Sequence, residues 1–427
     1  MKYIITTLGC KVNQYETQAI ETLLQARGHE PGQKGQADVV IINTCAVTAE
    51  SGRKSRQAVR RLMEDNPGAI SVVCGCWAQT DAEKAESLKA DVLFGSGDRV
   101  KLVEAIEDAL DSHERIVSVD RPFERREFED LPAGAFSGHA RAYLKIEDGC
   151  ANFCTYCIIP YARGRVRSLP PARAGEKAAA LAAQGYRELV VTGIEIASYG
   201  RDLEGRPGLS DVVCAISRAA PGLRLRLGSL EPTVVTEDFC RAIQKTGGVC
   251  RHFHLSLQSG CDETLRRMNR KYDTERFFSA VTLIREYFPG CAVTADLITG
   301  FPGETEEQHG ETLAFITKCG FADMHIFPYS RRPGTPADKM AGQLTHAVKS
   351  RRAAQAQQAA DRMKTAYLYS QIGAELPVLF ETEAEGVSVG HADNYALVSA
   401  VGERLRGVVK NVKITGVSGE MLVGHIV

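Results

Sequence analysis

The first part of the chain alternates between short apolar runs and longer segments with helical spacing of apolar residues. The runs KYIITTLG, ADVVIINTC, AISVVCGC and ADVLFGSG are nearly continuous in apolar character, as expected of parallel strands that are buried on both faces. Between or after them lie NQYETQAIETLLQARG, SGRKSRQAVRRLMED, DAEKAESLKA and KLVEAIEDAL, which predict helices. The pattern indicates a doubly wound parallel α/β domain over residues 1–112.

Two further regions follow a charged, irregular stretch at residues 113–138, which we interpret as a linker. Over residues 139–370, six strand-like runs alternate with helix-length segments, and a basic Ala/Gln-rich helix ends the region: AYLKIED, ELVVTG, LRLRLGS, HFHLSLQ, AVTADLITG and ADMHIFPYS. This order predicts a partial (β/α)6 barrel. Residues 371–427 contain short alternating runs with glycine breaks, which predict a small β-barrel.

Composition narrows the class of protein. A chain of 427 residues with 44% hydrophobic and 25% charged residues is typical of a globular protein with two or three domains. No apolar stretch approaches the roughly 20 residues of a membrane helix, and the N-terminus lacks a signal-peptide pattern, so we expect a cytoplasmic protein. The 13 cysteines then indicate metal binding or catalysis rather than disulfides.

Three cysteines stand close together in GCANFCTYC, at Cys150, Cys154 and Cys157. Three thiolates can hold three irons of a 4Fe–4S cube and leave the fourth iron open to a small molecule. A zinc site with a distant fourth ligand and three unrelated core cysteines are the alternatives. The loop follows the first barrel strand, at the carboxyl end where such barrels place their chemistry, which favours the cluster. Tyr156 could cover one side of a bound ligand.

A second set of cysteines follows three predicted strands of the first domain, at Cys10, Cys45 and Cys76. The carboxyl ends of parallel strands share one edge, so these thiols should converge on a second site, unless they are ordinary core residues. Cys74 lies on the same predicted strand as Cys76 and should point to a similar side, so either could be the ligand. Cys76 is nearer the strand end, and Gly75 allows close backbone approach.

These features resemble a known family. The C-x3-C-x2-C spacing on the first barrel loop resembles the radical S-adenosylmethionine (SAM) superfamily. Segments along essentially the whole chain resemble its methylthiotransferases, in the family's order: TLGCKVNQYET, NTCAVT, GCWAQ, GCANFCTYCIIPYARGRVRS, RLGSLEP, LSLQSG, RMNRKY, DLITGFPGET and FPYSRRPGTPA. The resemblance implies an N-terminal domain, a radical SAM barrel and a C-terminal TRAM domain. It also implies that the N-terminal cysteines, with Cys76 in the GC motif, bind a second 4Fe–4S cluster.

The chemistry that the resemblance implies uses both clusters and SAM. The cluster on Cys150, Cys154 and Cys157 would cleave SAM to a 5′-deoxyadenosyl radical. The cluster on Cys10, Cys45 and Cys76 would carry the sulfur, which a second SAM would methylate. Barrel position makes four residues candidate SAM contacts: Tyr156, Gly193, Glu231 and Ile298. Many radical SAM enzymes have Gly-Gly-Glu on the second strand, where this chain has TGIE.

The substrate depends on the branch of the family. Known branches act on isopentenyladenosine in tRNA, on threonylcarbamoyladenosine in tRNA, or on an aspartate of a ribosomal protein. The motif LGCKVNQYET resembles the threonylcarbamoyl branch, which implies methylthio insertion at C2 of N6-threonylcarbamoyladenosine 37. The implied partners are the tRNA anticodon stem-loop, a sulfur donor and an electron donor such as flavodoxin or ferredoxin. The other branches, and a non-enzymatic iron–sulfur RNA-binding protein, remain alternatives.

Charge offers a separate indication of RNA binding, although the net charge is only −1. Basic residues cluster after each cysteine site, and we expect them to contact RNA unless they merely solvate helix faces: Arg53, Lys54, Arg56, Arg163, Arg165 and Arg167. The tail from residue 371 has four Lys/Arg against seven Asp/Glu. Its TRAM-like barrel would therefore bind RNA through a local patch around Arg404 to Lys413, or serve as a dimerisation module or a cap.

Overall fold

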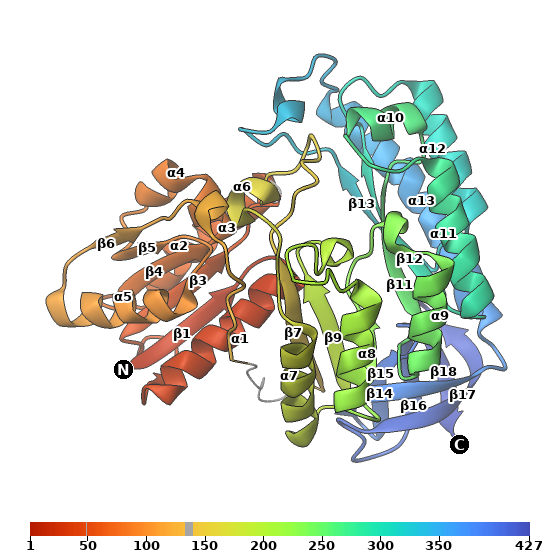
Figure 1. Cartoon of the computed structure of the whole chain (residues 1–427), viewed down its shortest axis with the longest axis horizontal. Helices are drawn as coiled ribbons and strands as arrows, with labels where there is room; N and C mark the ends of the chain where they lie inside the picture. Colours follow the sequence, from red (N-terminus) through yellow and green to blue (C-terminus); the bar gives the residue numbers. More distant parts are fainter. Residues whose placement is uncertain (48, 133–139) are drawn as a thin grey trace. The chain divides into compact units, whose positions relative to one another are not determined.

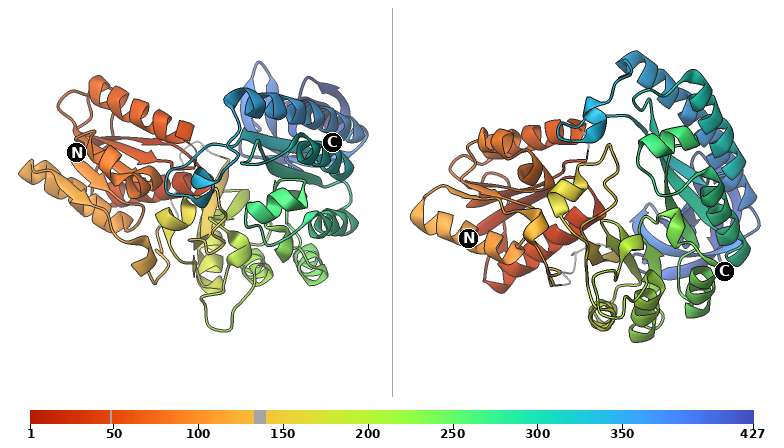
Figure 2. Two further views of the ribbon diagram at one scale, coloured as in Figure 1. Left: turned by 90° about the horizontal axis from the view of Figure 1, so that it is seen from above. Right: turned by 45° about the horizontal axis from the view of Figure 1, so that its top comes forward.

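The computed structural model describes residues 1–47, 49–132 and 140–427. Part of the predicted linker, residues 133–138, and the first barrel residue, 139, lie outside the described residues. The chain forms two compact units. The first takes the described residues of Met1–Phe136, Lys145–Leu169 and Ser330–Asp338, and the second takes those of Ser137–Leu144, Pro170–Tyr329 and Lys339–Val427. Figure 2 shows the chain from two further directions.

A parallel sheet forms the centre of the first unit, with the strand order β2-β1-β3-β4-β5-β6 (Figure 1). Its strands are β1 (Lys2–Thr7), β2 (Glu30–Pro31), β3 (Val39–Thr44), β4 (Ile70–Gly75), β5 (Val92–Phe94) and β6 (Ile116–Ser118). The four strands expected from the apolar runs are present. The short β6 lies in the stretch predicted to be a linker, because its backbone pairs with β5 although its sequence is not a long apolar run.

Helices cover both faces of this sheet, as the doubly wound pattern predicts. One face packs against α1 (Lys11–Ala26) and α5 (Arg99–Ser112) around a core that contains Ile41 and Val72. The opposite face, with Ile42 and Val73, packs against α2 (Ala49–Asp65), α3 (Cys76–Thr80) and α4 (Ala82–Glu86). The side chains alternate along β3 and β4, so each strand contributes to both cores.

The segment that carries the second cysteine triad also belongs to the first unit. It runs from the end of β7 (Arg141–Asp148) through α6 (Ile159–Arg163) to β8 (Arg167–Ser168), which pairs antiparallel with β7. Ile158 and Ala162 pack into the same apolar core as Trp77 of α3. Both cysteine sets are therefore placed by one packed body.

The second unit contains the strands expected of the partial barrel. β9 (Glu188–Gly193) pairs parallel with β10 (Arg224–Leu227), and β11 (His252–Gln258), β12 (Ala292–Thr299) and β13 (Asp323–Pro328) form a parallel sheet. The order β10-β9-β7-β8 adds β7, whose residues are shared between the units. Helices alternate with the strands: α7 (Pro171–Ala183), α8 (Leu209–Ala219), α9 (Glu237–Thr246), α10 (Asp262–Arg267), α11 (Thr274–Tyr287), α12 (Glu306–Cys319) and α13 (His346–Ser370). The six strand runs of the predicted barrel are confirmed.

The C-terminal segment closes into a small barrel of order β14-β15-β16-β18-β17. Its strands are β14 (Glu375–Ala384), β15 (Val387–Ala392), β16 (Leu397–Val401), β17 (Val409–Ser418) and β18 (Met421–Ile426). Arg226 of β10 ties this barrel to the parallel strands, because it binds Glu188 and donates hydrogen bonds to the carbonyls of Ala392 and Asp393. Among the residues that the structure describes, no helix is both long and apolar enough to cross a membrane.

Candidate functional site

The first cysteine set lies where three neighbouring parallel strands end. Cys10 follows β1 and is the N-cap residue before α1, Cys45 follows β3, and Cys76 follows β4 as the first residue of α3. Since β1, β3 and β4 are adjacent, the three thiols share one edge of the sheet. Burial raises the pKa of the Cys10 and Cys76 thiols, and negative charge on a neighbouring cysteine, Cys45 for Cys10 and Cys10 for Cys76, would raise it further. The strand order therefore brings the three cysteines to one edge of the sheet, as the sequence predicts.

Two glycines make this close approach possible. Gly9 has φ +113°, and a Cβ atom there would lie 2.8 Å from the Cβ of Cys45. Gly75 has φ +95°, and a Cβ atom there would lie 2.4 Å from Asn43 Oδ1 and 2.6 Å from the carbonyl of Thr44. Both positions need a residue without a side chain. In both Gly-Cys dipeptides, the backbone geometry requires the glycine and the cysteine supplies the thiol.

Cys74 and Cys76 do not point to a similar side, contrary to the expectation from sequence. The strand ends at Gly75, whose left-handed conformation turns the chain into α3. Cys74 therefore lies in the core beneath α1 and α5, where burial raises the pKa of its thiol to about 12. Cys76 lies on the opposite side, and its Sγ accepts a hydrogen bond of 3.2 Å from Nε of Arg163.

The second cysteine set lies on one loop after β7. Gly149 has φ +91°, and a Cβ atom there would lie only 1.9 Å from the carbonyl of Arg165. The backbone N–H of Cys150 donates to Gly164 at 3.0 Å, and that of Cys157 donates to Cys154 at 2.9 Å. Three thiols on a loop braced by backbone bonds fit a cluster with three protein ligands. Tyr156 is half-buried on the same loop.

A buried ionic network, not predicted from the sequence, lies beside the first set. Glu16 of α1 is fully buried and pairs with Arg163, Arg99 and Lys145. Burial alone would raise the pKa of its carboxyl, but these three cations outweigh that effect and lower it. The signal in the sequence is faint: a single Glu inside the buried face of a helix.

The basic residues divide into two classes. Arg163 and Arg167 are buried, with exposed fractions of 0% and 3%, so they are not on the surface that RNA would reach, and the expectation for these two is wrong. Asp148 and Glu16 draw their guanidinium groups inward. Arg53, Lys54 and Arg165 are exposed, and Arg56 is half-buried with its guanidinium 5.9 Å from the centre of the Trp77 ring.

Arg332 is a further site residue that sequence reasoning missed. It belongs to the segment Ser330–Asp338 of the first unit and is 6% exposed. Burial lowers the pKa of its guanidinium, and the charges of Asp81 and Cys45 act against that effect. A cation thus stands near Cys45, as Arg163 stands near Cys76.

The second unit holds three of the four predicted SAM contacts. Gly193 ends β9, Ile298 lies in β12, and Glu231 follows β10. Glu231 forms an ion pair with Arg270 at 3.1 Å, and both side chains are 5% exposed. Glu195, two residues after β9, was not predicted as a contact; burial and the charge of Glu231 raise its pKa to about 7. Its position in TGIE was the available signal.

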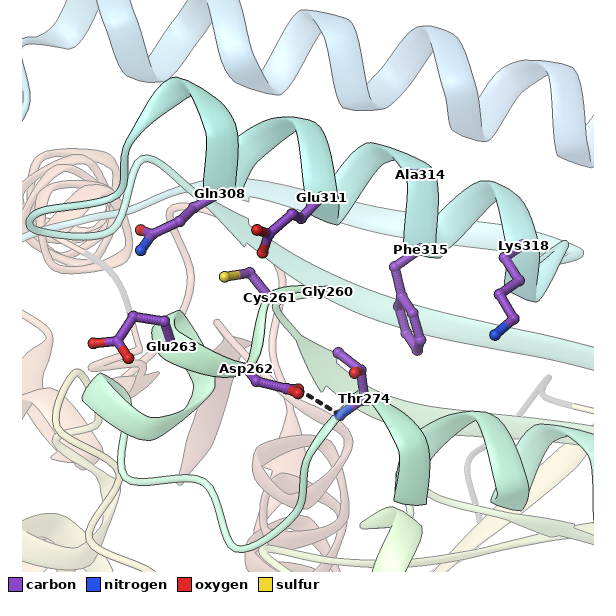
Figure 3. A pocket seen from close by; sticks show the side chains of 10 residues that line it. All are labelled: Gly260, Cys261, Asp262, Glu263, Thr274, Gln308, Glu311, Ala314, Phe315 and Lys318. Carbon is purple, nitrogen blue, oxygen red and sulfur yellow. Dashed lines mark hydrogen bonds between the residues drawn. The ribbon is translucent and has the colours of Figure 1, made fainter.

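Two polar features of the second unit lie outside the predicted sites. Among the described residues, one group of possible metal ligands has its atoms within 4.8 Å of one another: His254, Asp296 and His325, from β11, β12 and β13. A pocket of 480 Å³ lies between α10 and α12, with Cys261 and Glu311 facing it (Figure 3). Neither feature contains a residue predicted to bind a cluster or SAM.

Comparison with known proteins identifies the family. The Radical SAM superfamily matches residues 144–316, and the family described as Uncharacterized protein family UPF0004 matches residues 2–95. The threonylcarbamoyladenosine tRNA methylthiotransferase MtaB of Bacillus subtilis (strain 168) is 38% identical over 417 residues, which cover 96% of this chain and 92% of that protein. The MtaB of Thermotoga maritima is 34% identical, with coverages of 97% and 95%. The tRNA-2-methylthio-N(6)-dimethylallyladenosine synthase of Anoxybacillus flavithermus is 33% identical, with coverages of 100% and 83%.

Solved structures agree at the level of fold. The radical SAM methyltransferase TsrM of Kitasatospora setae, with cobalamin and a [4Fe-4S] cluster bound, has a TM-score of 0.59 at 16% identity and covers 91% of this chain and 80% of its own. OxsB with aqua-cobalamin bound has a TM-score of 0.54 at 11% identity, with coverages of 79% and 54%. Given the similarity in sequence over nearly the full length, the chain belongs to the methylthiotransferase family of radical SAM enzymes, which work with SAM and 4Fe–4S clusters.

Proposed function

We propose that the chain inserts a methylthio group at C2 of N6-threonylcarbamoyladenosine 37 in tRNA and so forms 2-methylthio-N6-threonylcarbamoyladenosine. The observation that carries this proposal is the 38% identity, over 96% of the chain, to a relative named for that substrate. The motif LGCKVNQYET supports the same branch. A relative named for dimethylallyladenosine is 33% identical over the whole chain, so dimethylallyl-type adenosine in tRNA is the second candidate substrate.

The proposed reaction explains the need for radical chemistry. An aromatic C2–H is too weak an acid for any side-chain base, so the cofactors supply the radical chemistry and the protein aims it. We assign one cluster to the loop of Cys150, Cys154 and Cys157. We assign the other to Cys10, Cys45 and Cys76, because Cys76 lies with Cys10 at the sheet edge and Cys74 does not.

Side chains of both charges lie at the proposed SAM contacts of the second unit, where Arg270 pairs with Glu231. We assign Gly193, Glu231 and Ile298 to this role, with Tyr156 from the cluster loop, and we add Glu195. SAM presents an ammonium and a carboxylate, and the Glu195, Glu231 and Arg270 group offers a partner for each charge. A half-buried carboxyl with a pKa near 7 is also typical of a ligand site rather than of a structural ion pair.

We expect SAM affinity to rise with pH because of Glu195. Its pKa is about 7 without ligand, so it is mostly protonated at pH 6 and half ionised at pH 7. If only the ionised carboxylate pairs with the SAM ammonium, which stays protonated in this range, affinity should increase about fivefold from pH 6 to pH 7. Equilibrium binding to the anaerobic, cluster-loaded protein measures this. Glu195→Gln should remove the pH dependence; a Gln variant that keeps it would refute the assignment.

For tRNA, we propose contacts through the basic residues that remain on the surface: Arg53, Lys54, Arg56 and Arg165. An exposed aromatic cluster supports an RNA-facing surface beside the cluster loop. Phe123, Phe153 and Tyr161 pack with ring centres 5.9–6.3 Å apart, and each is 38–40% exposed. Unstacked bases pack on such rings. We further propose a cytoplasmic enzyme that takes electrons from a flavodoxin or ferredoxin and sulfur from a separate donor.

Nucleoside mass spectrometry of tRNA from a deletion strain tests the substrate. We expect 2-methylthio-N6-threonylcarbamoyladenosine to disappear on deletion and N6-threonylcarbamoyladenosine to accumulate. The wild-type chain should restore the product, whereas Cys76→Ala and Cys157→Ala should not. If the product persists while the methylthio derivative of isopentenyladenosine, or methylthio-aspartate in a ribosomal protein, is lost, the proposed branch is wrong.

A further inference from the structure

We propose that Arg163 is a positioning residue for the first cysteine site: it holds Cys76 in place and raises the reduction potential of the cluster bound there. This inference rests on the proposed assignment of Cys10, Cys45 and Cys76 as ligands. Arg163 comes from α6, a few residues beyond the second triad, so the segment that carries one cysteine set supplies a contact to the other.

The guanidinium of Arg163 is fully buried and held from several sides. Its Nε donates to Cys76 Sγ at 3.2 Å. One terminal nitrogen donates to Asn13 Oδ1 at 2.9 Å and to Glu16 Oε2 at 3.0 Å, and the other pairs with Glu16 Oε1. A rigid, planar group with five N–H donors satisfies this geometry, and an ammonium group cannot.

Asn13 extends the same bonded unit to the other two cysteine positions. Its Nδ2 donates at 2.9 Å to the carbonyls of Leu8 and Thr44, which immediately precede the GC and Cys45 segments. The thiol of Cys10 lies 3.9 Å from Asn13 Oδ1. Arg163 and Asn13 therefore connect the three strand ends that present the thiols. A shift of Arg163 would change the position of each strand end.

The charges around Arg163 favour an anionic group at the site. Four basic side chains form ion pairs with Glu16 or Asp148: Arg99, Lys145, Arg163 and Arg167. A buried cation is stabilised by nearby negative charge, and Arg163 directs its Nε–H at Cys76 Sγ. A [4Fe–4S]2+ core with three thiolates carries one negative charge in excess. The residues present therefore fit such a cluster.

The effect on potential follows from electrostatics. Reduction adds a negative charge to the cluster, and a nearby cation that also donates an N–H to a ligand sulfur stabilises the reduced state more than the oxidised one. Hydrogen bonds to sulfur are among the established determinants of cluster potential. Removal of Arg163 should therefore make the first cluster harder to reduce and leave the second cluster's potential unchanged.

The chain offers a matched control for a merely structural role. Arg99 is also buried and also pairs with Glu16, but no hydrogen bond joins it to Cys10, Cys45 or Cys76 among the described contacts. Arg163→Gln and Arg99→Gln each remove one cation from Glu16. Only the first also removes the N–H donor to Cys76.

The test is a potentiometric titration of the full-length, anaerobically reconstituted protein, followed by EPR, with the signal that SAM perturbs as internal reference for the second site. Arg163→Gln should shift the other signal to more negative potential, and Arg163→Lys and Arg99→Gln should each shift it less. An unchanged potential in Arg163→Gln, or an equal shift in Arg99→Gln, would overturn the proposal.

Iron analysis covers the case in which Arg163→Gln loses the first cluster. The proposal that Arg163 holds Cys76 in place is supported if Arg163→Gln loses the first cluster and keeps the second. In that case the iron-free variant should also unfold at the same thermal midpoint as iron-free Arg99→Gln. Loss of both clusters with a lower midpoint would overturn it. If Cys76→Ala itself retains the first cluster, the ligand assignment has failed instead, which separates the two proposals.

Discussion

Cys76→Ala is expected to abolish methylthio insertion and to lower the iron content of the reconstituted protein by about four atoms per chain. The thiol lies at the sheet edge beside Arg163, and its loss would remove one of the three ligands that we propose for the first site. If the first cluster carries the sulfur, as we propose, no product can form without it. Iron and sulfide analysis together with product formation from tRNA in vitro measures both effects. SAM cleavage in the absence of tRNA should continue, because the second site is intact.

Cys74→Ala is the control for this prediction. Its sulfur lies two residues away in sequence but in the core beneath α1 and α5, where it donates to the carbonyl of Ile42 at 3.7 Å. The variant should keep full iron content and activity and lose about 1–2 kcal/mol of unfolding free energy to the small cavity. The reverse result, with iron lost in Cys74→Ala and kept in Cys76→Ala, would contradict the assignment of Cys76 as the ligand.

Cys157→Ala should reduce SAM cleavage, and with it product formation, to background. The loop itself should survive, because the bond from Cys157 to Cys154 joins backbone atoms and does not involve the thiol. What the variant removes is a proposed ligand of the cluster that would bind SAM. Anaerobic chromatography of 5′-deoxyadenosine measures cleavage, and EPR of the reduced protein shows which cluster remains.

Cys261→Ala serves as the matched control for Cys157→Ala. This cysteine lines the pocket of Figure 3 and lies near Glu311. In the sequence, no other cysteine follows or precedes it at the short spacing of cluster ligands. It should leave SAM cleavage at the wild-type rate. Residual cleavage in Cys157→Ala, or loss of the first cluster as well, would contradict the division of labour between the two triads.

Much of the fold follows from local pattern. Continuous apolar runs such as VVIIN are buried on both faces in the parallel sheet, and the six strand runs of the second unit appear where alternation placed them. Such patterns are readable because burial of apolar groups and backbone pairing act along a contiguous stretch. The sequence pattern does not predict β6, because a strand of three residues is too short to show a recognisable run of apolar residues. Its pairing with β5 depends on tertiary contacts.

The cysteine sites also combine features that the sequence predicts with features that depend on tertiary structure. The sequence by itself determined the C-x3-C-x2-C loop and the placement of Cys10, Cys45 and Cys76 at strand ends, since spacing and strand order are local properties. Only the tertiary structure decided that Arg163 is buried, because its partner Glu16 is 147 residues away. It also decided that Cys74 and Cys76 lie on opposite sides, because Gly75 turns the chain there. The sequence shows which residues carry a charge. Whether such a charge faces solvent or a buried carboxylate depends on which distant segment of the chain packs against it.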